Sequence, residues 1–147
     1  MTRRVFACTA AVVAVALGAG CGPRSTADSS SKFKGEQRLV ANAIEDLQDA
    51  GQRREASTIC SELLAADLVR KIRRAAGGGR KTCAQHLKTS LDDADDFELT
   101  VKGVTISGKT ARAVVVSGSS GSKDRRTETM RLVKEGRPGR WRVASLG

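Results

Sequence analysis

Residues 97–117 read FELTVKGVTISGKTARAVVVS, and apolar and polar residues alternate along most of this stretch. Alternation of this kind predicts half-buried β-strands. Gly103 shifts the phase of the alternation, which predicts a β-bulge at Lys102–Gly103. Gly108–Lys109 has the form of a two-residue hairpin turn. The stretch therefore predicts two antiparallel strands, the second of which covers Thr110–Ser117.

Two further strands are predicted after this hairpin. A Gly/Ser-rich loop over residues 117–124 leads to a third strand at about Arg126–Lys134. The turn Gly136–Gly139 then leads to a fourth strand at Trp141–Leu146. Short strands joined by tight turns are typical of an antiparallel meander. Along the second strand, the alternation separates two faces, one with Val114 and Val116 and the other with Ala111, Ala113 and Val115.

Helical periodicity replaces alternation in the part of the chain before the sheet. From Glu36 to Ala50, apolar residues fall on one stripe, and Gly51 is a natural C-terminal stop. Residues 52–76 continue with helical spacing, although Ser61 could cap a break between two shorter helices. Helices that precede an antiparallel meander predict an α+β domain, with a curved sheet of about four strands.

A further short helix is predicted between the glycine run at residues 77–79 and the sheet. Thr82 and Gln85 have the spacing of a capping box at its N-terminus. Its apolar face consists of Cys83, Leu87 and Leu91.

The N-terminus carries an export signal. Arg3 and Arg4 precede sixteen uncharged residues, 5–20, which form an apolar segment too short to span a bilayer comfortably. Small residues then lead into Cys21, an order that resembles a bacterial lipoprotein signal in which this cysteine becomes lipidated. Leu17 lies four residues before Cys21, whereas the usual motif has Leu three before it. The alternative is ordinary secretion, with cleavage near residues 14–16.

The lipoprotein resemblance implies three regions. Residues 1–20 are the signal peptide, residues 21–34 are a flexible Ser-rich tether, and residues 35–147 are a single domain. The implied location is the outer face of a bacterial cytoplasmic membrane, and two or more acyl chains on Cys21 provide a stable anchor there.

The cysteine count predicts a disulfide. Cys8 lies in the signal peptide, and a lipidated Cys21 leaves Cys60 and Cys83 as an even pair in an oxidising compartment. Their disulfide would contribute about 3 kcal/mol on the chain-entropy model. The alternative, a metal pair, lacks the usual spacing of zinc ligands. We therefore expect no metal site here.

The order of elements resembles a known superfamily. Its features are the cysteine-bearing segments Thr58–Leu63 and Thr82–Ala84, the Val-rich strand that follows Gly108–Ala111, and the final Gly139–Val143. Together they resemble secreted lipoproteins of the nuclear transport factor 2-like (SnoaL-like, cystatin-like cone) superfamily, over about Glu36–Leu146. The resemblance implies a cone whose mouth can hold a ligand or an active site. The superfamily includes isomerases, cyclases, dehydratases and binding modules, so the fold does not specify a function.

Motifs for catalysis and cofactor binding are weak. The chain has no Tyr, and its single histidine, His86, is expected on an exposed helix flank. The Gly77–Thr82 segment lacks the glycine spacing of a phosphate loop. An acidic cluster lacks the pattern of a calcium loop and is expected to be a solvated linker, and it consists of Asp92, Asp93, Asp95, Asp96 and Glu98. No cofactor is expected.

Positive charge is concentrated in one region. The formal net charge is +10 for the whole chain and about +6 for residues 36–147. A surface that could bind anionic lipid or wall polymers consists of Arg70, Lys71, Arg73, Arg74, Arg80 and Lys81, with Lys88 nearby. The alternative is a solvated helix face. Nucleic acid is not an expected partner, because the chain lacks a reading motif and has few aromatic residues.

These observations predict a lipid-anchored extracytoplasmic module that binds a small apolar ligand or a protein and is not an enzyme. The concave face of the sheet and the cone mouth are its expected working part. Apolar residues expected to line them are Val101, Val104, Val115 and Trp141. One alternative is an enzyme of the same fold, of isomerase or dehydratase type, with Asp or Glu inside the cone. Another is a structural module that forms homodimers through the sheet face.

Overall fold

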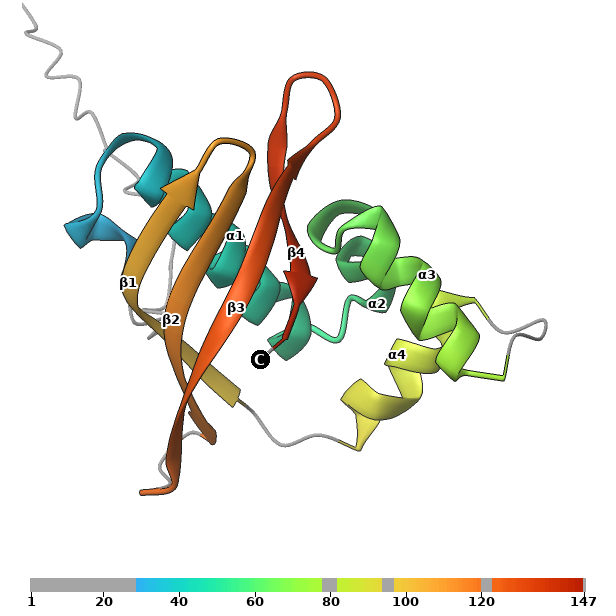
Figure 1. Cartoon of the computed structure of the whole chain (residues 1–147). Coiled ribbons are helices and arrows are strands. Elements are labelled where there is room, and N and C mark those ends of the chain that lie inside the picture. The colour runs from blue at the N-terminus through green and yellow to red at the C-terminus, as the bar shows by residue number, and fades with distance from the viewer. Residues whose placement is uncertain (1–28, 78–81, 94–96, 120–122, 147) are drawn as a thin grey trace, which may run out of the picture.

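A four-stranded antiparallel sheet forms the C-terminal half of the chain in the computed structural model (Figure 1). The structure describes residues 29–77, 82–93, 97–119 and 123–146. The strands lie in the order in which they occur in the sequence, as a meander of β1 (Phe97–Ser107), β2 (Thr110–Ser119), β3 (Arg125–Glu135) and β4 (Arg140–Ser145).

The predicted hairpin and bulge are confirmed. Val101 pairs with Val115, and the next pair joins Gly103 to Val114, so Lys102 is the extra residue of a bulge. Gly108, with a φ of 57°, provides the left-handed turn between β1 and β2. The two predicted faces of β2 are also correct, because its burial alternates between exposed and buried residues from Thr110 to Val115.

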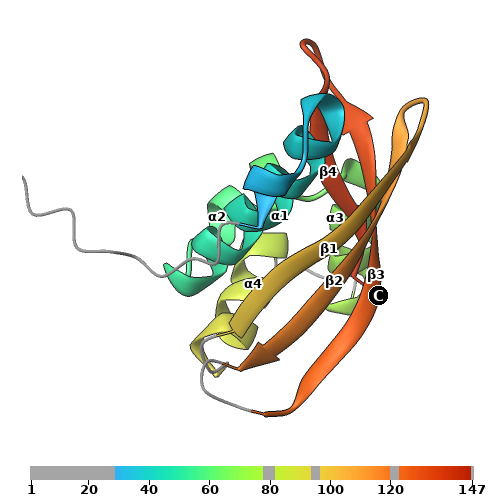
Figure 2. The same ribbon diagram turned by 90° about the vertical axis from the view of Figure 1, so that its left-hand side faces the viewer.

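Helix α1 (Gly35–Gln52) lies across one face of the sheet (Figures 1 and 2). The helical segments that follow α1 in the chain lie near or beyond the β4 edge in Figure 1. They are α2 (Ala56–Thr58), the π-helical turn η2 (Ile59–Leu63), α3 (Ala66–Ala75) and α4 (Cys83–Asp92). The α+β prediction is confirmed, and helices packed on a bent four-stranded antiparallel sheet fit the cone that the resemblance implies.

The helical region after α1 differs from the prediction. The helix continues one residue past Gly51, and its left-handed terminating residue is Arg54, with a φ of 57°. Glu55 N–H donates to the Ala50 carbonyl at 2.9 Å and Arg54 N–H to Gly51 at 2.9 Å, a Schellman termination. The later break falls at residues 64–65 rather than at Ser61.

Tertiary pairing with the sheet explains where this break falls. Leu64 forms a parallel bridge with Val143 of β4. Ala65 N–H donates to the Val143 carbonyl at 2.8 Å. A backbone that is paired with β4 at this point cannot also continue a helix, and periodicity alone does not show such a bridge.

The capping box that was predicted before α4 is confirmed. Thr82 N–H donates to Gln85 Oε1 at 2.9 Å, and Gln85 N–H donates to Thr82 Oγ1 at 3.3 Å. Cys83 and Leu91 are buried and Leu87 is partly buried, as their shared helical face predicts.

Residues 29–34, which the sequence assigns to the tether, are part of the folded domain. Ser29 and Ser30 are 3% and 4% exposed. Their backbone N–H groups donate to Glu45 Oε1 of α1, each at 2.8 Å. A short 3₁₀ helix, η1 (Ser30–Lys32), follows. The proposed signal peptide, Cys21 and the first tether residues lie outside the described residues.

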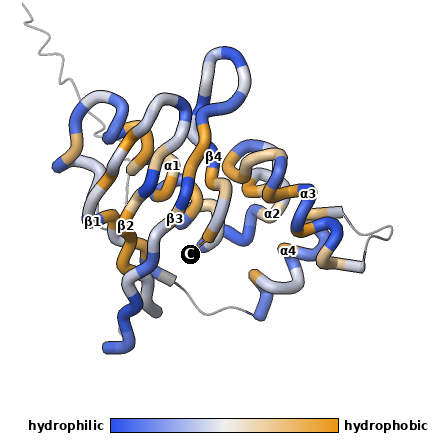
Figure 3. The backbone as a smooth tube through the Cα atoms, in the orientation of Figure 1, coloured by the Kyte–Doolittle hydropathy of each residue, from blue (hydrophilic) through white to orange (hydrophobic). Residues whose placement is uncertain are grey.

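The core lies between α1 and the sheet. Val40 and Ile44 of α1 and Val101, Leu132 and Val143 of the sheet are fully buried. Figure 3 shows hydrophobic positions along α1 and the central strands, whereas the first part of β3 is hydrophilic. None of the helices in the described ranges combines the length and the apolar character needed to cross a membrane.

A polar cluster joins the start of α1 to the end of the sheet. Glu36 accepts from Lys134 Nζ at 2.8 Å and from Trp141 Nε1 at 2.8 Å. The Lys134 ammonium also lies 5.7 Å from the centroid of the Trp141 ring, within the range of a cation–π contact. These hydrogen bonds, first that from Lys134 and then that from Trp141, hold the pKa of Glu36 below its ordinary value.

Candidate functional site

An apolar cavity of about 290 Å³ lies between the helices and the concave face of the sheet. Every helical segment from α1 to α4 except the short α2 contributes to its wall, as do the first three strands and a residue after β4. The lining residues are Leu47, Gly51, Ile59, Leu64, Ile72, Leu87, Leu91, Leu99, Val115, Ser117, Glu128, Met130 and Leu146.

The position of this cavity follows from where α1 ends. The Schellman termination at Arg54 ends α1 beside the cavity, where Leu47 and Gly51 line the wall and Gln48 Oε1 accepts from Leu99 N–H of β1. The cavity wall is completed by α4, which contributes Leu87 and Leu91.

A disulfide fixes α4 in this position. Cys60 of η2 and Cys83, the first residue of α4, are joined with a sulfur–sulfur distance of 2.07 Å and a Cα–Cα distance of 6.1 Å. The predicted disulfide is thus present in the structure. It links the two segments that place Ile59 and Leu87 in the cavity wall, so it supports both stability and the shape of the cavity.

Among the described residues that line this cavity, only Glu128 has a titratable side chain. It pairs with Val115 across β2 and β3, while Met130 pairs with Ala113. Paired residues on neighbouring strands share a face, so Glu128 lies on the same concave face as Val115 and Met130. Glu128 itself is exposed, which places its carboxylate at the mouth.

Sequence analysis did not identify Glu128, although the signal was present. Glu128, Met130 and Leu132 alternate at the spacing of one strand face. Met130 and Leu132 are 4% and 0% exposed, which identifies that face as the inner one. The position of the cavity was not visible from this pattern, because it depends on where α1 ends.

The four residues expected to line the mouth have different positions. Val115 lines the apolar cavity, and Trp141 lines a second cavity described below. Val101 and Val104 are 0% and 8% exposed and belong to the core. They pack below α1 and do not line either cavity.

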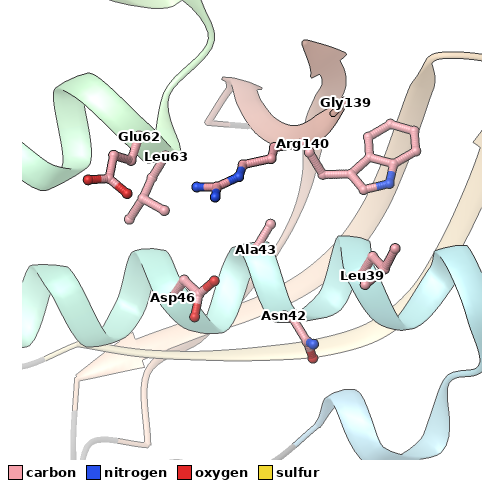
Figure 4. A pocket seen from close by; sticks show the side chains of 9 residues that line it. Leu39, Asn42, Ala43, Asp46, Glu62, Leu63, Gly139 and Arg140 are labelled. Carbon is pink, nitrogen blue, oxygen red and sulfur yellow. The ribbon is translucent and has the colours of Figure 1, made fainter. Parts of the chain in front are cut away.

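The second cavity, of about 340 Å³, lies on the outer side of α1 near the β3–β4 turn (Figure 4). It combines apolar and charged groups, and its lining residues are Leu39, Asn42, Ala43, Asp46, Glu62, Leu63, Gly139, Arg140 and Trp141. Burial raises the pKa of Asp46, and so do Asp49 and Glu45, whereas Arg53 opposes them. Figure 4 shows the Arg140 side chain extended toward Glu62 and Leu63.

The predicted basic surface is only partly described. Arg70, Lys71, Arg73 and Arg74 are exposed on α3, and Arg70 forms an ion pair with Asp67. Arg80 and Lys81 lie outside the described residues, as does Cys21. Lys88 of α4 is exposed and pairs with Asp92 at 3.2 Å.

Neither His86 nor the described members of the acidic cluster, Asp92, Asp93 and Glu98, are among the lining residues of the apolar cavity. His86 is exposed on α4, as the sequence predicted. Asp92 and Asp93 are exposed, whereas Asp95 and Asp96 lie outside the described residues. Among the residues with described positions, no group of three or more His, Cys, Asp or Glu side chains could hold a metal ion.

No protein-family model and no curated protein matches this chain. Among solved structures, it is similar to a form of Rd1NTF2_05 with five substitutions, at 16% identity and a TM-score of 0.48, over 74% of this chain and 95% of that one. It is also similar to an NTF-2 like protein of unknown function from Shewanella oneidensis MR-1, at 14% identity and a TM-score of 0.47, over 75% and 95%. The α+β assignment rests on the topology of this chain itself.

Proposed function

We propose that this chain is a lipid-anchored extracytoplasmic module that binds a small apolar ligand in the cavity between its helices and the concave face of its sheet. The observation that carries the proposal is the composition of the cavity wall, in which aliphatic side chains from several elements surround about 290 Å³ of space. Small-molecule sites are typically about 300–1,000 Å³, mostly apolar and with few polar groups. At about 290 Å³, this cavity is just below the lower limit of that range.

The mouth of the cavity supports an exchangeable ligand. Leu146, at the mouth, is 57% exposed, although it is apolar. An apolar ligand that covered Leu146 and filled the cavity would remove apolar surface from water, at about 25 cal/mol per Å².

The proposed location rests on Cys21 and on the disulfide. Structural disulfides persist in oxidising compartments, which agrees with an exported protein. Because Ser29 and Ser30 are held by Glu45 of α1, the proposed tether contains at most residues 21–28 and spans at most about 29 Å when extended. An intact mass of the membrane-extracted protein tests this proposal: a chain that starts at Cys21 and carries acyl groups supports it, and an unmodified chain that starts elsewhere contradicts it.

An enzyme of the same fold is the second candidate, and Glu128 is the observation that favours it. A carboxylate at the mouth of a ligand cavity could transfer a proton. General acid–base catalysis usually requires a carboxyl group with a tuned pKa and a positioned partner, and Glu128 is exposed. We therefore favour binding over catalysis.

The experiment that tests ligand binding introduces a larger side chain on the sheet, so that it occupies part of the cavity. Val115→Phe adds a ring to a residue that is 1% exposed and lines the cavity, so it should abolish binding of N-phenyl-1-naphthylamine, a neutral apolar fluorescent probe. The control is Val114→Phe, the same substitution one residue away on the opposite face, where Val114 is 40% exposed. The protein is the oxidised chain 21–147 with Cys21→Ser.

The proposal requires that the probe binds to the parent chain and to Val114→Phe with similar affinity, and that Val115→Phe remains folded by thermal unfolding. Probe binding that is unchanged in a folded Val115→Phe variant would contradict the proposal, because the probe would then lie elsewhere.

A further inference from the structure

One carboxylate lies on an inner surface that is mostly aliphatic. Glu128 shares the concave face of the sheet with Val115, its partner across the strands, and with Met130. Val115 and Met130 are 1% and 4% exposed, and both line the apolar cavity. The cavity therefore has an aliphatic interior and a negative charge at one position of its wall.

The surroundings of Glu128 leave its carboxylate available to a ligand. Within the described ranges, it forms no ion pair or hydrogen bond to another side chain. Arg126 is two residues away on the same face, opposite Ser117, but it is exposed and does not line the cavity. Arg125 is on the other face, where its guanidinium lies 3.7 Å from Glu98.

Ser117 adds a second polar group close to this carboxylate. It lines the cavity and pairs with Arg126, so it is a diagonal neighbour of Glu128 on the same face. Diagonal neighbours have Cβ atoms about 7 Å apart, which one ligand head group can bridge. The two polar lining residues thus lie together at one end, and the apolar residues occupy the rest.

We infer that the cavity selects an apolar amine: a protonated amino group that binds the Glu128 carboxylate, and an aliphatic or aromatic body that fills the apolar space. This inference rests on the proposed function and specifies its ligand class. An ammonium donates up to three hydrogen bonds, so it matches the Glu128 carboxylate together with the Ser117 hydroxyl. A carboxylate ligand would be repelled by Glu128, whereas an alcohol could donate a single hydrogen bond to it but carries no positive charge to form an ion pair.

The expected selectivity is modest, because Glu128 is exposed. Ion pairs at exposed positions are screened by water and salt, whereas hydrogen bonds to charged groups are stronger than neutral ones. We expect an amine to bind about three- to tenfold more tightly than an alcohol of equal chain length at low ionic strength. The preference should decrease as salt is added.

The test compares three ligands with the same tail. Octylamine, 1-octanol and octanoate are titrated at pH 7 against the oxidised chain 21–147 with Cys21→Ser, and each dissociation constant is measured by displacement of N-phenyl-1-naphthylamine. The test variant is Glu128→Gln. The control is Glu62→Gln, the same substitution at an exposed glutamate that lines the second cavity instead.

The inference requires that octylamine binds most tightly, that Glu128→Gln removes its advantage over octanol, and that Glu62→Gln keeps it. Affinity for octanol should be unchanged in Glu128→Gln, which shows that the cavity remains intact. A preference for octylamine that persists in Glu128→Gln would overturn the inference. Loss of this preference in Glu62→Gln but not in Glu128→Gln would also overturn it, because the amine would then bind in the second cavity.

Two other outcomes separate this inference from the proposed function. Equal binding of octylamine and octanol, or tighter binding of octanoate through Arg126, would overturn the amine preference and leave apolar binding supported. If none of the three ligands displaces the probe, and the probe itself does not bind, both the inference and the proposed function fail.

Discussion

The two ends of the sheet differ in what covers the same concave face. At one end, Leu132 and Val143 of the sheet belong to the same hydrophobic core as Val40 and Ile44 of α1, and all four side chains are fully buried. At the other end, the concave face borders a cavity of about 290 Å³, where Val115 is among the lining residues. One surface with one pattern of alternation thus forms a packed core at one end and a ligand-sized space at the other.

The difference shows that the length of α1 decides where packing stops. Helix α1 ends at Gln52 and turns at Arg54, and beyond this point the chain is held by the bridge to β4 and by the disulfide between η2 and α4. We call the end of the sheet with Leu132 and Val143 the packed end, and the end that borders the apolar cavity the hollow end. We expect the packed end to determine most of the stability and the hollow end to determine binding.

The largest expected effect comes from a truncation at the packed end. Leu132→Ala should reduce the free energy of unfolding by about 4 kcal/mol, because a fully buried leucine leaves a cavity that closely packed neighbours cannot fill. Leu99→Ala, at a residue that lines the existing cavity, should cost about 2 kcal/mol. Urea denaturation of both variants measures the difference, and equal losses would show that the two ends are packed alike.

The second effect tests the covalent link of the hollow end. Replacing Cys60 and Cys83 together by Ser should reduce the free energy of unfolding by about 3 kcal/mol on the chain-entropy model. It should also weaken probe binding, because α4 carries Leu87 and Leu91 of the cavity wall. Stability comes from denaturation and affinity from probe titration.

Reduction of the unmutated pair provides the control for this prediction. Dithiothreitol should have the same two effects on the parent chain and none on the double variant. A double variant that loses stability but binds the probe with unchanged affinity would show that α4 keeps its position without the disulfide.

Sequence alone was sufficient for features that depend on neighbouring residues. The bulge at Lys102–Gly103, the turn at Gly108 and the capping box of Thr82 and Gln85 follow from local backbone geometry. The pair Cys60–Cys83 followed from counting, because the other two cysteines lie in or directly after the predicted signal peptide.

Features that depend on distant contacts were not predicted. The helix break at residues 64–65 depends on pairing with Val143, which is far away in the sequence. Glu128 was on the correct face by alternation, but its role depends on the space left by the end of α1. Val101 and Val104 were placed at the mouth because their pattern is the same as that of Val115, although of the three only Val115 lines the cavity.

The smallest effect that we expect is at the polar cluster that joins α1 to the packed end. Because hydrogen bonds from Lys134 and Trp141 lower the pKa of Glu36, its ionised form stabilises the folded state above the ordinary pKa of 4.5, and this stabilisation is lost as the pH falls through the lowered value. Glu36→Gln should therefore reduce stability at pH 7 by less than either change above, since Glu36 is half exposed. The free energy of unfolding of the variant should also decrease less than that of the parent as the pH falls below about 4.5.

Trp141 is the single tryptophan, so its fluorescence during urea denaturation from pH 7 to pH 3 reports on this end directly. If the variant and the parent lose stability in parallel across this range, Glu36 does not hold α1 on the sheet, and apolar packing alone closes the packed end.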